Sequence, residues 1–186
     1  MKTIIVGVTG SIAAYKAADI VSGLKKMDWD VHVVMTKNGA AFISPLTMQS
    51  LSRNQVYVDV LQEDKPEQIV HVELPQKADL LLIAPATANV IGKIAWGIAD
   101  DMLTSMVLAV NDIPKLIAPA MNTRMYENDA VQHNLQRLEQ RGWHSIEPRV
   151  ARLACGYEGK GALAEVRTIV QAVTDISSTF KQGGNL

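Results

Sequence analysis

The sequence predicts a three-layer α/β sandwich, in which a doubly wound parallel sheet of the Rossmann or flavodoxin-like kind lies between two layers of helices. Three observations predict this class. Short apolar runs recur along the 186-residue chain, and segments with helical apolar spacing separate them. The runs are apolar at successive positions, which is typical of strands buried on both faces of a parallel sheet. The length suits one domain with a sizeable core.

The first half of the chain contains three runs of strand length. Residues 4–8 form a short run that stops at a Gly-Ser pair, so we interpret it as a buried strand and not a signal peptide. Residues 30–36 are rich in valine. Residues 79–84 are the most hydrophobic run, and we expect this strand at the centre of the sheet. Helices are expected between the strands, over residues 11–27 and 45–51.

The second half continues the alternation. Helical spacing covers residues 87–96 and 102–110, and a further strand is expected at 115–118. An amphipathic helix at 129–141 should end at the glycine that follows it, before a short strand at 143–146 and a closing helix at 165–178. We expect a single domain over residues 1–180 and a disordered tail at 181–186, where polar residues and two glycines dominate.

Composition excludes several classes of protein. The formal net charge is -1, so no global positive field would hold nucleic acid or an anionic membrane surface. No apolar stretch approaches the roughly 20 residues that span a bilayer. Cys155 is the single cysteine, so the chain can form neither an internal disulfide nor a cysteine-rich zinc cluster, and we expect no metal site. A reducing, cytoplasmic location is the simplest interpretation.

Ligands of doubly wound sheets bind beyond the carboxyl ends of the strands, so the residues after each strand are candidates. Thr9-Gly10-Ser11 follows the first strand and could present N–H groups to an anion, or Ser11 could simply cap a helix. Thr36-Lys37 follows the second strand, where a dinucleotide-binding domain usually has an acidic residue. This favours a ligand with a terminal phosphate over NAD, although Thr36 could equally be a helix cap.

The ends of the next two strands carry small and polar residues. Thr87 and Asn89 follow the central strand among alanines, which would let a flat ligand approach the backbone; close packing of a helix on the sheet is the alternative. Asn122 follows the strand at 115–118, between Met121 and Met125, whose side chains could form an adaptable apolar wall. A structural turn would explain this segment equally well.

Two further residues are chemical candidates. His71 lies in an apolar segment upstream of the central strand, where a lone histidine is more often structural than catalytic. Cys155 lies close to three glycines, which suggests a mobile flap. A buried cysteine is the usual case, but the glycines and charged residues around Cys155 favour a reactive role.

Five segments together resemble the homo-oligomeric flavin-containing cysteine decarboxylases. They are residues 9–16, 84–93, 99–104, 119–125 and 153–156. The resemblance extends from the first strand to about Glu165. The P-x-M-N-x-x-M element at 119–125 and the cysteine flap are its specific parts, whereas the glycine turn is not specific.

The resemblance implies a carboxy-lyase of coenzyme A biosynthesis. It implies FMN-dependent decarboxylation of 4'-phospho-N-pantothenoylcysteine to 4'-phosphopantetheine, through a thioaldehyde and then an enethiol. His71 would be the base, Cys155 a late proton donor, and Asn122 the group that holds the substrate carboxylate, with Met125 and Ala154 beside it. The residues expected around FMN are Gly10, Ser11, Ile12, Thr36, Lys37, Phe42, Thr87, Ala88, Asn89, Val90 and Ala120.

The residue types suit this chemistry. Loss of CO2 needs an electron sink, and oxidation of the carbon that bears sulfur provides one, with no net redox change when the electrons return. A histidine with a pKa of about 6.5 can accept a proton at neutral pH. Asn122 can bind a carboxylate without stabilising its charge as an ion pair would. A thiol with a pKa of about 8.5 is mostly protonated and can donate.

The resemblance also implies a homotrimer with FMN between subunits, and four such trimers often form a dodecamer in this family. Many relatives are fused to a synthetase domain. The 186 residues leave no room for such a domain, so we expect a separate phosphopantothenate–cysteine ligase chain. The sequence departs from the family at Tyr126, where tryptophan is frequent, and at Ala162, where arginine is frequent. Both positions are expected to touch the substrate region.

Four other functions are alternatives to this one. A relative could decarboxylate the C-terminal cysteine of a peptide, and another could transfer a prenyl group to FMN, although the cysteine flap favours decarboxylation. A non-catalytic, flavin-binding regulatory subunit would not need His71, Asn122 and Cys155 together. A nicotinamide-dependent dehydrogenase is disfavoured by Thr36-Lys37.

Overall fold

The computed structural model describes residues 1–61, 69–110, 112–152, 156 and 158–179. The predicted tail at 181–186 lies outside these residues, as do Ala154 and Cys155. Within the described part of the chain, no helix is both long and apolar enough to cross a bilayer.

Six parallel strands form the central sheet, which confirms the predicted class. Their order is β3-β2-β1-β4-β5-β6, and each neighbouring pair is parallel. The direction of the strand order reverses between β1 and β4, which is where doubly wound sheets open a crevice for a ligand. The strands are β1 (Lys2–Val8), β2 (Trp29–Met35), β3 (Val56–Tyr57), β4 (Leu80–Ala86), β5 (Lys115–Pro119) and β6 (Trp143–Ser145).

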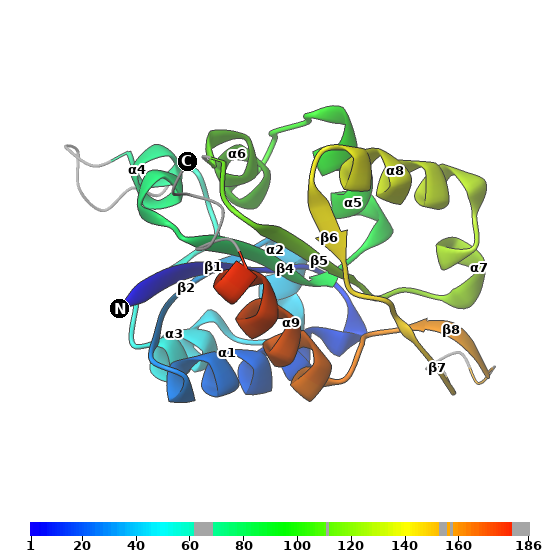
Figure 1. Ribbon diagram of the computed structural model, residues 1–186, viewed down its shortest axis with the longest axis horizontal. Coiled ribbons are helices and arrows are strands. Elements are labelled where there is room, and N and C mark those ends of the chain that lie inside the picture. Colours follow the sequence, from blue (N-terminus) through cyan, green and yellow to red (C-terminus); the bar gives the residue numbers. More distant parts are fainter. Residues whose placement is uncertain (62–68, 111, 153–155, 157, 180–186) are drawn as a thin grey trace.

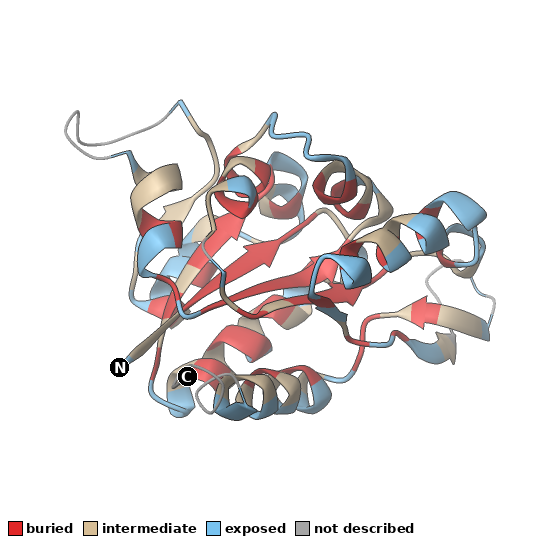
Figure 2. Ribbon diagram, turned by 45° about the horizontal axis from the view of Figure 1, so that its top comes forward, coloured by how far each residue is buried: buried red, intermediate tan, exposed pale blue. Residues whose placement is uncertain are grey.

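Helices cover both faces of the sheet, as Figure 1 shows. One layer contains α1 (Lys16–Lys26), α3 (Pro45–Ser52) and α9 (Val166–Thr179). The other layer contains α4 (Val70–Lys77), α5 (Ala88–Trp96), α6 (Met102–Ala109) and α8 (Asp129–Gln140). The strands between the layers are buried along most of their length (Figure 2).

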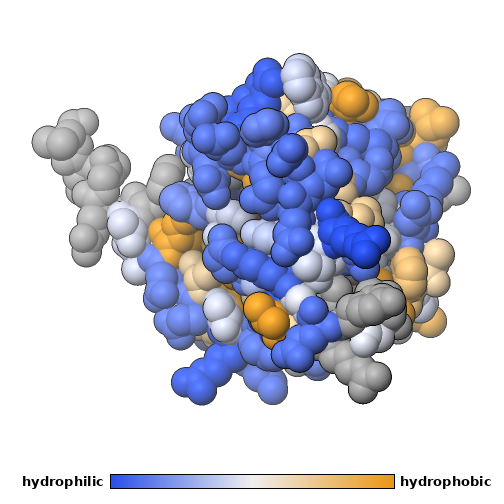
Figure 3. All heavy atoms as spheres, turned by 90° about the vertical axis from the view of Figure 1, so that its right-hand side faces the viewer, coloured by the Kyte–Doolittle hydropathy of each residue, from blue (hydrophilic) through white to orange (hydrophobic). Residues whose placement is uncertain are grey.

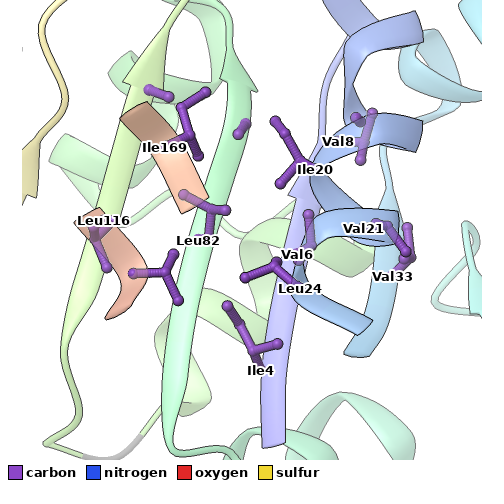
Figure 4. Close-up of a cluster of buried hydrophobic side chains, with 14 of the residues drawn as sticks. Ile4, Val6, Val8, Ile20, Val21, Leu24, Val33, Leu82, Leu116 and Ile169 are labelled. Carbon is purple, nitrogen blue, oxygen red and sulfur yellow. The ribbon is translucent and has the colours of Figure 1, made fainter. Parts of the chain in front are cut away.

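The two faces of the sheet have separate cores. Ile4, Val6 and Val8 of β1 pack with α1 and α9, as the close-up in Figure 4 shows, whereas Ile5 belongs to the core on the opposite face. Successive side chains of a strand point to opposite faces, so a strand covered on both sides must be apolar at every position. Each fully buried aliphatic side chain contributes about 1.5–3 kcal/mol by leaving water, which explains the unbroken apolar runs.

The expected helix at 11–27 is wrong in detail. Ile12–Tyr15 form a 3₁₀ helix, η1, and α1 begins only at Lys16. The Ser11 hydroxyl accepts a hydrogen bond from the Ala13 N–H at 3.3 Å and so starts the tighter turn before the α-helix.

Several short elements were not predicted. They are α2 (Lys37–Phe42), β3, α4, α7 (Thr123–Tyr126) and an antiparallel hairpin of β7 (Arg149–Arg152) and β8 (Glu158–Ala162). Most of them are too short to show a period. Helix α4 is as long as α3 and α6, but it contains a proline, which usually argues against a helix.

Candidate active site

A cavity of about 820 Å³ lies beyond the carboxyl ends of the strands, at the reversal between β1 and β4. The segments that follow β1, β2, β3, β4 and β5 line it, together with the end of β8. The cavity is therefore where strand topology predicts a ligand. The predicted residues that line it are Gly10, Ser11, Ile12, Thr36, Lys37, Thr87, Ala88, Asn89, Val90, Ala120, Asn122 and Met125.

A buried hydroxyl ties two walls of the cavity together. Thr9 follows β1, and its Oγ1 donates to the carbonyl oxygen of Pro85 at 2.7 Å. The hydroxyl oxygen of Thr9 also accepts the N–H of Thr87 at 3.1 Å. Because a hydroxyl can donate and accept at once, Thr9 holds the ends of β1 and β4 at a set separation, and with them the segments expected to hold a flavin.

Hydroxyl caps begin the helices around the cavity. Ser11 caps η1, Thr36 caps α2 by accepting the Gly39 N–H at 3.0 Å, and Thr87 caps α5 by accepting the Val90 N–H at 3.4 Å. The capping interpretation of these residues is thus confirmed. It does not compete with ligand binding, because a capping hydroxyl keeps a proton to donate and helix N-termini favour anions.

Asn122 also has a structural role. Its Oδ1 accepts the Arg124 N–H at 2.9 Å and so caps α7. The bond sets the orientation of the amide, so its NH2 group is the part that can donate to an anion. A neutral donor on the wall of the cavity is suited to a carboxylate.

Charged pairs on the cavity wall were not predicted. Lys93 lies 2.6 Å from Asp100 and 3.4 Å from Asp101, measured from Nζ to the carboxylate oxygens. The hydrogen bond to Asp100 raises the pKa of the Lys93 ammonium and lowers the pKa of the Asp100 carboxyl. Asp101 also accepts the Thr104 N–H at 2.8 Å and caps α6. The pattern of aspartate and threonine three residues apart is a capping signal that could have located this turn.

A second ion pair lies on the cavity wall that the segments after β2 and β3 form. Lys37 Nζ is 3.2 Å from Asp59 Oδ2, and both residues line the cavity. The pKa of the Asp59 carboxyl is lowered, mainly by a hydrogen bond from the Leu61 N–H and to a smaller extent by the contact with Lys37. Asp59 follows the short strand β3, so this wall could not be predicted without that strand.

Three predicted residues lie outside the lining of the cavity. His71 is in the first turn of α4, which packs on α6, and Figure 1 shows α4 and α7 at opposite ends of the molecule. Phe42 ends α2, whose start and not its end faces the cavity. Tyr126 is 6% exposed and packs beneath Lys160, and it is not among the residues that line the cavity, whereas Ala162 does line it.

The predicted roles of Cys155 and Ala154 fall on positions outside the described residues. The flanking strands β7 and β8 pair antiparallel, and the end of β8 lines the cavity. Among the described residues, no group of three histidine, cysteine or acidic side chains is arranged to hold a metal ion.

The residues of the cavity fit FMN. Ala88 and Ala120 are small enough to let a flat ring approach the backbone, and Val90 and Met121 offer apolar contacts. The polar side of the cavity supplies hydroxyl groups at Ser11 and Thr36 and a cation at Lys37. Such a set suits a terminal phosphate.

Comparison with known proteins gives a consistent group of relatives. The family model described as Flavoprotein matches residues 1–178. A "Probable phosphopantothenoylcysteine decarboxylase" of Streptococcus mutans is 48% identical over 175 residues, which cover 94% of this chain and 98% of the relative. The "Coenzyme A biosynthesis bifunctional protein CoaBC" of Bacillus subtilis is 49% identical over 170 residues, or 91% of this chain. The chain spans only 42% of the length of that relative.

Solved structures share the fold over nearly the whole chain. A cysteine-to-serine mutant of PPC decarboxylase, complexed with pantothenoylaminoethenethiol, is 31% identical with a TM-score of 0.84, and the match covers 98% of this chain and 99% of that one. The FMN-dependent cysteine decarboxylase SpaF is 30% identical with a TM-score of 0.83, over 96% of this chain and 97% of that one.

Proposed function

The chain belongs to the flavoprotein family, and we propose that within this family it decarboxylates phosphopantothenoylcysteine in coenzyme A biosynthesis. It is a carboxy-lyase whose product is 4'-phosphopantetheine. The observation that carries this assignment is the match to the Streptococcus mutans relative along nearly the full length of both chains. The shared fold and the cavity at the switch point support it.

FMN is the flavin that we propose for this site. The solved relative SpaF is FMN-dependent, and Thr36 and Lys37 stand after β2 where an adenine dinucleotide would require an acidic residue. When bound, FMN supplies reversible two-electron oxidation of the carbon that bears sulfur. The protein supplies orientation, exclusion of water and proton transfer.

Asn122 is the residue that we assign to the substrate carboxylate, with Met125 beside it. Both line the cavity, and the cap on α7 holds the Asn122 amide in one orientation. A neutral donor binds the carboxylate but stabilises its charge less than an arginine would. The ground state is therefore lowered less relative to the transition state for loss of CO2.

His71 acts, in this proposal, on the cavity of a neighbouring copy in a homotrimer. It does not line the cavity of its own chain. Apolar side chains at the cavity are exposed in the single chain: Ile12 is 64% exposed, Tyr15 59% and Met125 49%. Apolar surface of this kind beside a ligand site is typical of a subunit interface, and a neighbour would also bring Phe42 within reach of a second site.

Cys155 is assigned the late proton transfer. The mutant PPC decarboxylase that retains pantothenoylaminoethenethiol carries serine in place of a cysteine. This chain has a single cysteine, so the equivalent function can belong only to Cys155. Ala154 would lie beside the substrate. A reducing, cytoplasmic location would keep this thiol available.

The ligase activity that makes the substrate lies, in our proposal, outside these 186 residues. The chain spans 42% of the bifunctional relative from Bacillus subtilis, so a second activity of that protein has more than half of its length available. We propose a phosphopantothenate–cysteine ligase activity as the partner in the pathway.

The test combines cofactor identity with substrate choice. The purified protein should be yellow, release FMN on denaturation, and convert 4'-phospho-N-pantothenoylcysteine to CO2 and 4'-phosphopantetheine. A peptide that ends in cysteine should be turned over at least about 100-fold less efficiently, because it lacks the phosphopantothenoyl group whose binding energy positions the reacting end. Preference for the peptide, or a protein that stays colourless after incubation with FMN, would contradict the assignment.

Asn122→Asp gives a sharper prediction about the carboxylate. Aspartate caps a helix as well as asparagine does, so α7 should stay intact. It removes the amide donor and adds a charge of the same sign as the substrate carboxylate. Loss of a hydrogen bond to a charged group costs about 1.5–3 kcal/mol, so kcat/KM should fall by about 10- to 150-fold while bound FMN stays unchanged.

Asn128→Asp is the matched control. Asn128 caps α8 through the Ala130 N–H at 3.0 Å, in the same way as Asn122 caps α7, but it does not line the cavity. Its variant should keep wild-type kinetics. Equal losses in the two variants would show that the cap, and not the carboxylate contact, explains the effect.

A further inference from the structure

The hairpin strand β8 packs directly on the segment that carries Asn122. The Met121 N–H donates to the carbonyl oxygen of Gly161 at 2.9 Å, and β8 lies against α7. Gly161, Met121 and Asn122 all line the cavity. The position of β8 and the position of the Asn122 amide are therefore set by one shared contact. Figure 3 views the side of the molecule on which α7 and the hairpin lie, a largely hydrophilic face with scattered hydrophobic side chains.

Two glycines make this packing close. A methyl group on Gly159 would lie 2.9 Å from Cγ2 and 3.0 Å from Cβ of Thr123, and closer still to its Oγ1. A methyl group on Gly161 would overlap the carbonyl oxygen of Met121 and lie 3.3 Å from the Thr123 nitrogen. The obstacle at Gly159 is thus a side chain, whereas the obstacle at Gly161 is backbone.

The backbone at Gly161 adds a second constraint. Its φ is +149°, in a region that residues with a side chain rarely adopt. A substitution there would strain the strand whatever the space around it. Gly159 has no such constraint, and the three atoms nearest to an added methyl group there all belong to Thr123.

Thr123 can be trimmed without losing a bond. Its Oγ1 is buried and has no hydrogen-bond partner among the residues that the structure describes. Thr123→Ala removes this hydroxyl, which relieves a desolvation cost, and it removes the Cγ2 methyl group as well. Thr123→Ala should therefore fold, and it would remove the two nearest obstacles to a methyl group on Gly159, which leaves the contact with the Thr123 Cβ at 3.0 Å for a small shift to relieve.

Lys160, which lies between the two glycines, also joins β8 to α7. Lys160 Nζ lies 5.5 Å from the centre of the Tyr126 ring and forms an ion pair with Glu147. Tyr126 is the last residue of α7, so β8 contacts this helix at both ends: at Thr123 through the glycine and at Tyr126 through the cation.

We propose that Gly159 and Gly161 are positioning residues for the decarboxylation: the absence of their side chains lets β8 pack on residues 121–126 and hold Asn122 at the cavity wall. The kinetic part of this inference depends on the proposed function. The packing part does not, because it concerns the Met121–Gly161 hydrogen bond.

The experiment is a suppressor test. Gly159→Ala should raise the KM for 4'-phospho-N-pantothenoylcysteine by about tenfold or more, as overpacking displaces the strand, while the amount of bound FMN stays the same. Adding Thr123→Ala should bring KM back to within about threefold of the wild type. Gly161→Ala should show a similar loss that Thr123→Ala does not repair, because its obstacle is backbone.

Amide hydrogen exchange at Met121 is the readout independent of activity. Exchange should be slow in the wild type and in Thr123→Ala, fast in Gly159→Ala, and slow again in the double variant. If the wild type shows this protection but no turnover, the proposed function fails while the packing inference stands.

Three results would overturn the inference. They are a wild-type KM for Gly159→Ala, unchanged protection of the Met121 amide in that variant, and failure of Thr123→Ala to restore either property. Should Gly159→Ala alone not fold, a folded and active double variant supports the inference, and an unfolded double variant overturns it.

Discussion

His71→Asn should abolish CO2 release from 4'-phospho-N-pantothenoylcysteine while the protein still binds FMN. A general base contributes about 10²- to 10⁴-fold to a reaction, and asparagine keeps much of the shape of histidine but cannot accept the proton. Because oxidation of the substrate precedes loss of CO2, bleaching of the flavin absorbance on mixing with substrate should slow by the same factor. Stopped-flow absorbance measures the rate of this bleaching directly.

His133→Asn is the control for this substitution. His133 lies on α8 and is exposed, and it does not line the large cavity. Its variant should bleach at the wild-type rate. A His71→Asn variant that also bleaches at that rate would remove His71 from the first step of the reaction.

Mixed oligomers can locate His71 relative to the cavity. If His71 acts on a neighbouring copy, one site uses His71 of one subunit and Asn122 of another. Joint refolding of His71→Asn and Asn122→Asp chains in equal amounts should then give about a quarter of the sites with both native residues. Activity near that level is expected, well above the activity of either variant alone. Continued inactivity of the mixture would show that both residues serve the same site from the same chain.

The sequence predicted the sheet well because its signal is local. The run at 79–84 overlaps β4 and the run at 4–8 lies within β1, since strands covered on both faces must be apolar at each position. Strand β3 was missed because it has only two residues, and it exists through its parallel pairing with Val33 and Val34 of β2. No local pattern encodes a pairing between residues so far apart in the chain.

Much of the cavity could be predicted once the strands were predicted. Parallel strands bring their carboxyl ends to one edge, so residues after each predicted strand had to meet, and Thr36, Thr87 and Asn122 do line one cavity. Asp59 was missed together with β3. Lys93 and Asp100 were missed because their contact spans the turn that follows α5, and no periodic signal links two residues across a turn.

His71 shows a different limit. Its chemistry could be predicted from the residue type, but His71 does not line the cavity of its own chain. In our proposal it reaches the cavity of a neighbouring copy, and that placement depends on how copies of the chain meet. Contacts between subunits depend on surface shape as well as composition, and exposed residues such as Tyr15 look the same in the sequence whether solvent or a partner covers them.

Cys155→Ser should separate loss of CO2 from formation of the saturated thiol. Two electrons leave the substrate when the carbon that bears sulfur is oxidised, and they return only when the enethiol carbon receives a proton. A hydroxyl is a much weaker acid than a thiol with a pKa of about 8.5. Under anaerobic conditions, the variant should therefore release about one CO2 per bound FMN, stay bleached, and form 4'-phosphopantetheine at least about 100-fold more slowly.

The variant Cys155→Ala decides whether the proton or the size of the side chain matters. Alanine and serine both lack an effective acid, so both variants should stop at the enethiol, detectable by mass spectrometry as a product two hydrogens short of 4'-phosphopantetheine. Formation of the saturated thiol by either variant at the wild-type rate would mean that another group donates the proton. Because the chain has no other cysteine, that donor would have to be sought among the residues of the cavity or in the solvent.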